Sequence, residues 1–448
     1  MQTEGVMKQS ETPANSAPVL ASSRPPAVPV FGDREQTITP TGFSDALDTA
    51  AMRGDFDKGL SLQVYLPFCT TRCISCDRVA EVATDSSVID RYLNNLGSEL
   101  ALITDRIGRG RPLAQLHVGG GTPSLLNSSQ LALLAALIDE HFYIGSDCET
   151  VFEITPDRTS LTQLELIKGL GFRNLRIELR EIESSAPLGL GRSYSPELLQ
   201  DMLSNAKQVN FDAITFDVVY GLPGQTVSAV RDGIRLITEM SPTRVLCRPF
   251  ERDEQRFEHQ RGIDSHTMPS VPEKMSMFAA IVDQLESSGF EWIGINSFAK
   301  PDDALSHAQS EGRLVRNRLG YSDKPTRIVL GVGLGAVSEL PNLLSRNHTS
   351  LEAWHESLDN KMSPTCAGVI FTTVEAKQRR LVHRLSETLR APLTEFQGAE
   401  QQGLLDQLQA EGLVTAESEW VQVTDSGRFR LLQLWDPDSG DLKIAKSA

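Results

Sequence analysis

The sequence predicts an α/β fold: a parallel (β/α)6-type partial TIM barrel, followed by a C-terminal helical, winged-helix-like domain. Short apolar runs alternate with amphipathic runs six times between residues 61 and 290, as strands and helices do. No apolar run in that range is joined to the next by a short turn, so the strands are expected to be parallel. An open doubly wound sheet obeys the same connection rules and is the alternative architecture.

The strands of the expected sheet are six apolar runs, at 61–66, 114–118, 149–154, 174–179, 212–220 and 243–250. Helices are expected between them, over 87–106 and 128–142 and from starting points near Ser160, Ser195 and Thr226. Ser and Thr favour helix starts because their hydroxyls accept hydrogen bonds from free N–H groups of the first turn. A further strand is predicted at 292–298. In either architecture, ligands bind beyond the carboxyl ends of the parallel strands.

Composition suggests the domain boundaries. The first segment is rich in Ser, Pro, Thr and Gln and is expected to be a disordered tail, and an arm with a short helix near Ser44 to Arg53 leads into the barrel. From Val374 the pattern changes to helices and a short β-wing. The expected units are a tail at 1–35, an arm at 36–60, the barrel at 61–300, an extension and connector at 301–373, and the C-terminal domain at 374–448.

Charge and hydropathy exclude several classes of partner. The 448 residues include 43 Lys and Arg against 59 Asp and Glu, a net charge of −16 that repels nucleic acid. No apolar run reaches the roughly 18 residues of a membrane span, and residues 1–31 lack the apolar stretch of a secretion signal. We therefore expect a cytoplasmic monomer that has no nucleic-acid partner and no membrane span.

The cysteines indicate a metal centre. Three of the six, Cys69, Cys73 and Cys76, fall within eight residues directly after the first strand. A loop with this spacing can wrap three thiolates around one inorganic core. A four-iron cluster held by three cysteines leaves one iron open to another ligand. Zinc is the alternative, but a structural zinc site needs a fourth ligand and no further Cys or His lies close in the sequence.

A glycine-rich segment, His117 to Pro123 (HVGGGTP), follows the second strand and allows backbone to approach a ligand closely. The cysteine triad, this segment, VYLPFC before the triad, YGLPGQT at 220–226 and the segment at 298–321 together carry a resemblance. On these motifs the sequence resembles the radical S-adenosylmethionine (SAM) superfamily and, within it, the oxygen-independent coproporphyrinogen III oxidase family. The resemblance covers about residues 40–435.

The resemblance implies a 4Fe–4S cluster with three Cys ligands and one open iron, which chelates SAM. An electron from a donor such as flavodoxin or ferredoxin would then release a 5′-deoxyadenosyl radical that abstracts hydrogen from a substrate. In this family the reaction converts two propionates of coproporphyrinogen III into vinyl groups, giving protoporphyrinogen IX in haem biosynthesis. Some relatives bind haem and act as chaperones, and a radical SAM enzyme for another tetrapyrrole is a further alternative.

The resemblance also implies roles for individual residues. The contacts to SAM would come from Ser75, Gly120, Gly121, Thr122, Glu153 and Val337. A second SAM would be held by Arg192 and Asp217. For Glu153, the alternative is a salt bridge to an arginine of the barrel, because a carboxylate in an apolar strand needs a partner.

The sequence departs from the oxidases at several positions. Arg78 stands where they have a fourth cysteine, Gln63 and Tyr65 replace a Tyr and a His, and Arg180 and Glu251 replace two residues of the second SAM site. These departures put the second SAM in doubt.

The fourth strand places Arg176, Glu178 and Arg180 on one face, because strand side chains alternate. They can form an ion-pair lattice with Glu153 and Asp217 that fills part of the barrel. Alternatively, Arg176, Arg180 and Arg248 can form a basic pocket for a propionate.

Overall fold

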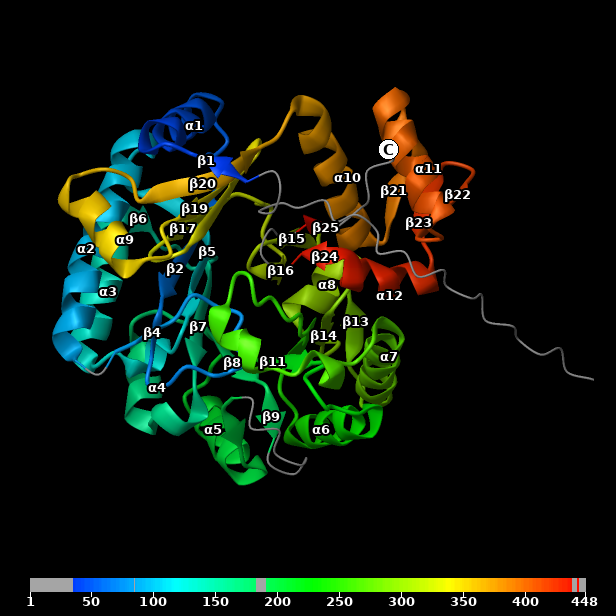
Figure 1. The fold of residues 1–448 in the computed structure, drawn as a ribbon, viewed down its shortest axis with the longest axis horizontal. Helices are drawn as coiled ribbons and strands as arrows, with labels where there is room; N and C mark the ends of the chain where they lie inside the picture. The colour runs from blue at the N-terminus through cyan, green and yellow to red at the C-terminus, as the bar shows by residue number, and fades with distance from the viewer. Residues whose placement is uncertain (1–34, 84, 183–190, 437–440, 443–448) are drawn as a thin grey trace, which may run out of the picture.

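The computed structural model describes residues 35–83, 85–182, 191–436 and 441–442. Its main feature is a 14-stranded sheet whose strand order ends at two free edges, so the barrel is open (Figure 1). Six parallel strands lie side by side in sequence order at its centre. They are β2 (Leu60–Leu66), β5 (Arg111–Gly120), β7 (Glu149–Ile154), β8 (Asn174–Leu179), β11 (Ala213–Tyr220) and β12 (Arg244–Pro249). The predicted (β/α)6-type partial barrel is confirmed.

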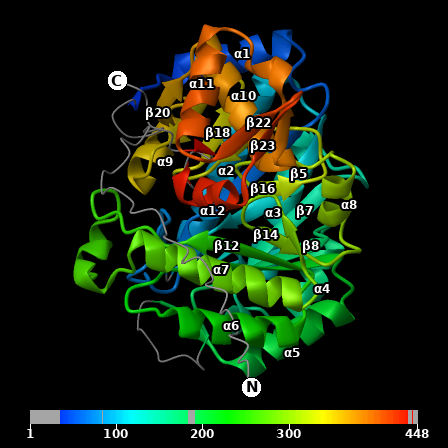
Figure 2. The ribbon, with the colours of Figure 1, turned by 90° about the vertical axis from the view of Figure 1, so that its right-hand side faces the viewer.

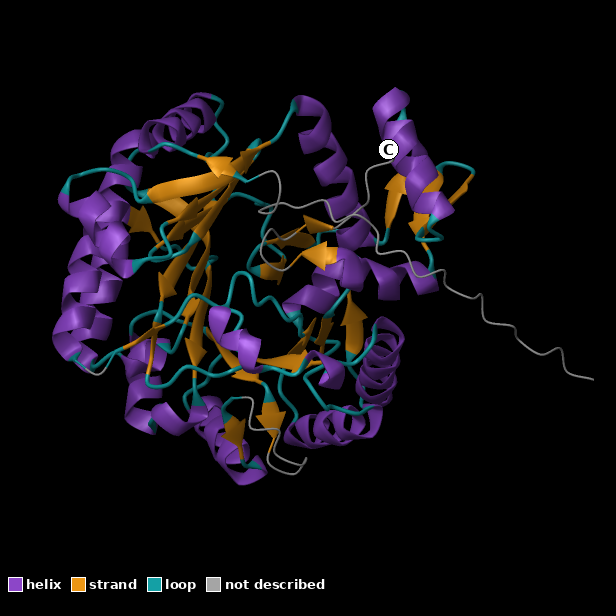
Figure 3. Cartoon of the chain, in the orientation of Figure 1, coloured by secondary structure: helices purple, strands orange, loops and turns teal. Residues whose placement is uncertain are grey.

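A helix follows each of these strands, and the helices surround the strands on the outside (Figure 3). Ser160, Ser195 and Thr226 are the N-caps of the third, fourth and fifth of these helices, as predicted. Each accepts a hydrogen bond from the backbone N–H three residues later. The helices are α2 (Ser86–Ile107), α3 (Ser128–His141), α4 (Leu161–Gly169), α5 (Pro196–Gln208), α6 (Val227–Met240) and α7 (Val271–Ser287). Helices α6 and α7 run next to each other (Figure 2).

One edge of the parallel sheet is extended by antiparallel strands. Strand β17 (Val329–Val332) pairs in parallel with β2, and the chain then returns through successive antiparallel pairs. These are β18 (Val337–Leu340), β19 (Leu343–Asn347), β20 (Thr365–Ile370) and β1 (Gln36–Thr37). The expected arm helix is α1 (Pro40–Met52), whose Phe43 and Leu47 are buried. The expected tail lies outside the described residues except for its last residue, Glu35.

The other edge corrects the prediction of one strand at 292–298. This segment forms two short antiparallel strands, β13 (Glu291–Ile293) and β14 (Ser297–Ala299), and β14 pairs antiparallel with β12. The chain turns at Gly294, whose φ of +51° favours glycine. A run of apolar residues is expected both in one long strand and in a tight hairpin of two short strands. The sequence pattern therefore did not reveal the turn.

The C-terminal part is helical with a small wing, as predicted. Helices α10 (Thr373–Thr388), α11 (Ala399–Ala410) and α12 (Asp425–Leu434) accompany a three-stranded antiparallel sheet. Its strands are β21 (Arg390–Pro392), β23 (Trp420–Val423) and β22 (Val414–Glu417). The connector before it contains α8 (Ala304–Ser310), β15 (Val315–Asn317), β16 (Gly320–Ser322) and α9 (Leu351–Asp359). Within the described ranges, none of the helices has both the length and the apolar character needed to cross a bilayer.

Candidate active site

The cysteine loop leaves the carboxyl end of β2 and lies against the glycine-rich segment that follows β5. The N–H of Gly121 donates to the carbonyl of Leu66 at 2.7 Å, and the N–H of Thr122 donates to the carbonyl of Phe68 at 2.7 Å. A Cβ at Gly121 would lie 2.5 Å from the Phe68 oxygen, so only glycine allows this approach. The two motifs that the sequence singled out are therefore bonded to each other through their backbones.

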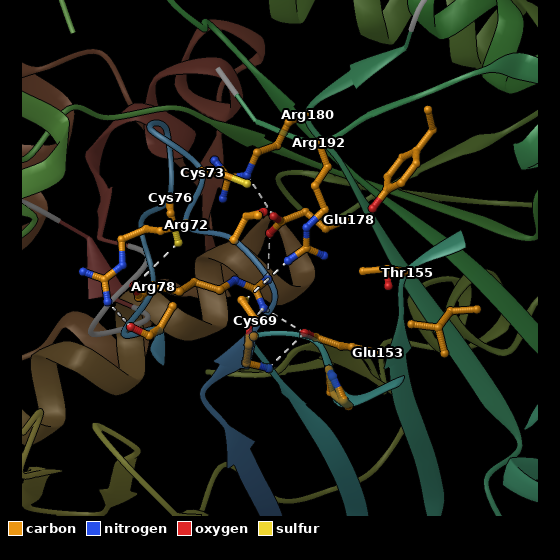
Figure 4. A pocket seen from close by; sticks show the side chains of 17 residues that line it. Cys69, Arg72, Cys73, Cys76, Arg78, Glu153, Thr155, Glu178, Arg180 and Arg192 are labelled. Carbon is orange, nitrogen blue, oxygen red and sulfur yellow. Dashed lines mark hydrogen bonds and ion pairs between the residues drawn. The ribbon is translucent and has the colours of Figure 1, made fainter. Parts of the chain in front are cut away.

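Cys69, Cys73 and Cys76 line one pocket of about 50 Å³ together with Gly120 and Gly121 (Figure 4). In the part of the chain that the structure describes, no three Cys, His, Asp or Glu side chains converge closely enough to hold one metal ion. A cubane cluster does not require such convergence, because each cysteine binds a different iron at its own corner. Three thiols around a shared pocket thus fit a cluster with three protein ligands.

Residues from other segments form hydrogen bonds with the cysteine loop, one of them to a cysteine sulfur. Arg192 Nη2 donates to Cys69 Sγ at 3.4 Å and to Thr122 Oγ1 at 2.8 Å. The carbonyl of Cys76 accepts a hydrogen bond from Gln260 Nε2 at 2.8 Å and lies 2.8 Å from His259 Nε2. The sequence analysis did not predict His259 and Gln260, because they lie more than 180 residues after Cys76 in the chain and belong to no recognisable motif.

Glu153 lies at the end of β7, beneath the glycine segment. It accepts hydrogen bonds from the Gly120 N–H at 3.0 Å and from Arg78 Nη1 at 2.7 Å, and its Oε1 lies 3.0 Å from His117 Nε2. Burial would raise its pKa, but the Arg78 charge and the His117 hydrogen bond hold that pKa well below the usual value. A Cβ at Gly119 would lie 2.5 Å from the Glu153 carboxyl carbon, so the glycine makes room for the carboxylate.

Arg78 occupies the centre of this arrangement, although the sequence marked it only as a departure from the oxidases. Its guanidinium donates to the Gly120 carbonyl at 2.8 Å, to Glu153 at 2.7 Å and to Glu178 Oε2 at 2.8 Å. Glu153 thus forms a salt bridge, as the alternative predicted, but its partner is an arginine of the cysteine loop and not one of the barrel strands.

Around Arg78, charged side chains occupy part of the interior of the barrel in a network that we call the lattice. Arg180 pairs with Asp77 at 2.6 Å and with Glu178 at 2.9 Å. Arg248 pairs with Asp77, Glu178 and Asp217 at 3.0, 2.7 and 3.0 Å. Arg176 pairs with Asp217 at 2.6 Å. The lattice has four cations and four anions: Arg78, Arg176, Arg180, Arg248, Asp77, Glu153, Glu178 and Asp217.

The lattice decides between the two interpretations of the fourth strand. Arg176, Arg180 and Arg248 are all ion-paired to carboxylates, so the predicted basic pocket made of these three is wrong and the predicted ion-pair lattice is confirmed. Asp217 is fully buried, and both of its oxygens accept hydrogen bonds from arginines of the lattice. Arg192 instead faces the cysteine pocket, so the structure does not bring the two expected second-SAM residues together.

Of the remaining site residues, Ser75 and Thr122 are buried near the cysteine loop, and Val337 lines a second cavity. Ser75 is buried, and its carbonyl accepts a hydrogen bond from Arg180 Nη1 at 2.6 Å. Thr122 is buried beside Cys69. Val337, the first residue of β18, lines a second cavity of about 410 Å³ with Arg78, Gly120 and Glu153. Gly121 and Val337, which are both expected to contact one SAM, therefore line different cavities, and Arg78 lines both.

Comparisons with known proteins agree with this geometry. Residues 64–237, which run from within β2 to within α6, match the family model of the Radical SAM superfamily. This part of the chain is a radical SAM domain. The whole chain is 29% identical to the oxygen-independent coproporphyrinogen III oxidase of Salmonella typhimurium, and the match covers 86% of this chain and 87% of that one. It is 27% identical to the enzyme of that name from Synechocystis, over 91% and 89% of the two chains.

A solved structure extends the likeness to the whole fold. The coproporphyrinogen III oxidase of Escherichia coli, described as a radical SAM enzyme, superposes with a TM-score of 0.77 at 27% identity. The match covers 88% of this chain and 91% of the Escherichia coli chain, so it extends well beyond the radical SAM domain.

Proposed function

We propose that this radical SAM protein is an oxidoreductase of tetrapyrrole metabolism, which decarboxylates propionates of coproporphyrinogen III to vinyl groups. Cys69, Cys73 and Cys76 would hold a 4Fe–4S cluster and leave one iron open. The observation that carries the proposal is the backbone bonding of the glycine segment to the cysteine loop, which places thiols, glycine carbonyls and the Glu153 carboxylate around one pocket.

When bound, the cluster and SAM supply a one-electron cleavage that yields the hydrogen-abstracting radical. The residues of the chain bind and orient these groups. Gly120 and Gly121 bring backbone to the pocket, Thr122 lies beside Cys69, and Glu153 offers a carboxylate whose low pKa keeps it ionised for a cationic ligand. For each propionate, the substrate loses one hydrogen atom, one carbon dioxide and one electron, and the electron goes to an acceptor.

One SAM fits the described residues better than two, because Asp217 is already enclosed by Arg176 and Arg248. This difference favours a second candidate function, a radical SAM reaction on another tetrapyrrole. Binding of haem without catalysis, as in a chaperone, is a third. An electron donor such as flavodoxin or ferredoxin belongs to both catalytic proposals.

The test uses protein purified without oxygen and reconstituted with iron and sulfide. It is supplied with SAM, a reductant and coproporphyrinogen III, and vinyl product and 5′-deoxyadenosine are measured by chromatography. Both products are expected. Deoxyadenosine without vinyl product would point to another substrate, and tight haem binding without either product would point to a chaperone.

Replacement of a cluster cysteine gives the matched control for the assignment of the iron ligands. Cys73→Ala is expected to lose the iron and both products, whereas Cys148→Ala, at a buried cysteine outside the loop, is expected to keep them. If Cys73→Ala retained its iron and still formed deoxyadenosine, the cluster assignment would be wrong.

A further inference from the structure

Three residues line both cavities of the site: Arg78, Gly120 and Glu153. The same three are joined by the hydrogen bonds from the Arg78 guanidinium to the Gly120 carbonyl and to Glu153. These bonds therefore separate the cysteine pocket from the larger cavity of about 410 Å³. Gly121 lines only the former, and Val337 lines only the latter. A SAM molecule that touched both residues would have to pass the position of Arg78.

The groups that hold Arg78 are the acceptors that an ammonium group needs. An ammonium is a donor only and pairs with carbonyl and carboxylate oxygens, which here are the oxygens of Gly120 and Glu153. The α-ammonium of SAM and the Arg78 guanidinium are both cations, so they cannot occupy this position together. The lattice is balanced at four charges of each sign, so loss of Arg78 leaves one uncompensated negative charge. An incoming ammonium would restore the balance.

We propose that Arg78 closes the SAM site of this protein, by occupying the ammonium position until SAM displaces it. The proposal rests on the proposed function, because it concerns affinity for the same SAM. Displacement breaks the charge-assisted hydrogen bonds from Arg78 to Gly120, Glu153 and Glu178. Part of the binding free energy of SAM is therefore needed to displace Arg78. The affinity of the protein for SAM is lower than it would be without this arginine.

The experiment measures the Kd for radiolabelled SAM by equilibrium dialysis on the reconstituted protein, with iron content determined for every sample. Arg78→Ala is expected to bind SAM about tenfold more tightly than the wild type. Arg78→Lys is expected to lie between the two, because one ammonium cannot span three acceptors as a guanidinium does. If Arg78→Ala does not fold, Arg78→Lys carries the test, with a gain of about threefold expected.

Arg244→Ala is the matched control. Arg244 is also largely buried and bridges two carboxylates, Glu149 at 3.1 Å and Asp303 at 2.9 Å, but it lines neither cavity of the site. Its Kd for SAM is expected to equal that of the wild type. Equal affinities in all four proteins would overturn the proposed closure by Arg78. Weaker binding in the Arg78 variants would also overturn it, since Arg78 would then be a ligand of SAM. Absence of SAM binding in every iron-loaded protein would overturn the proposed function itself.

Discussion

Substitution of Asp217 by Asn tests whether the lattice stabilises the barrel. Asp217 is fully buried in β11, where Oδ2 accepts from Arg176 Nη2 at 2.6 Å and Oδ1 accepts from Arg248 Nε at 3.0 Å. Asn keeps the shape, but it removes the negative charge and places an NH₂ donor against one of the two arginines. Removing one partner of a buried ion pair costs about 3–5 kcal/mol. Because Asn keeps one acceptor oxygen, we expect a loss near the lower end, about 3 kcal/mol.

The measurement is urea unfolding at pH 7, followed by far-ultraviolet circular dichroism, with Asp359→Asn as the control. Asp359 also pairs with an arginine, Arg91 at 3.0 Å, but the two side chains are 52% and 61% exposed. Exposed pairs contribute roughly 0–1 kcal/mol, so the control is expected to lose no more than this. A loss for Asp217→Asn as small as that of the control would refute the stabilising role of the lattice.

The difference in unfolding free energy between the wild type and Asp217→Asn is expected to depend on pH. Burial raises the pKa of Asp217, but Arg248 and Arg176 more than offset this and hold that pKa below the usual value. The stability from its charge is therefore complete above the unfolded-state pKa of about 3.9 and is lost as the pH falls towards the folded-state value. The difference between wild type and variant should be constant from about pH 5 to 8 and should shrink below about pH 4. A difference that changes steadily between pH 5 and 8 would contradict this assignment.

Two other substitutions test the space beside Glu153 and the protonation of Glu99. Gly119→Ala places a Cβ 2.5 Å from the Glu153 carboxyl carbon, so we expect weaker SAM binding and a loss of about 1–3 kcal/mol, whereas Gly169→Ala, with open space around it, should be neutral in both measurements. Burial raises the pKa of Glu99 to about 8, so the folded protein keeps a proton that the unfolded chain releases above about pH 4.3. Glu99 therefore lowers stability progressively as the pH rises from about 4 to 8, and Glu99→Gln should gain stability relative to the wild type between pH 5 and pH 8. An unchanged difference in unfolding free energy across that range would contradict the raised pKa.

The local features of the fold could be predicted because they depend on neighbours in the sequence. Apolar runs marked the six parallel strands, and the helix N-caps fell at Ser160, Ser195 and Thr226, where the hydroxyl can reach the N–H three residues on. The hairpin at 291–299 was missed because a run of apolar residues looks alike in one strand and in two. Its turn at Gly294 is favoured by packing against Tyr321, a residue of a different element.

The chemical groups of this site can be read from the sequence without a structure: three thiols in one loop after a strand, a glycine segment after the next strand, and the residue types of the lattice. Parallel strands bring the ends of neighbouring strands together, so the adjacency of these two motifs followed from topology. Which charged side chains pair with each other depends on the three-dimensional arrangement of the strands and the cysteine loop. Arg78 contacts Glu153 and Glu178 at separations of 75 and 100 residues, and Arg248 contacts Asp77 across 171 residues. Such pairings depend on the curvature of the sheet and on the competition of each cation for several carboxylates, neither of which a sequence pattern specifies.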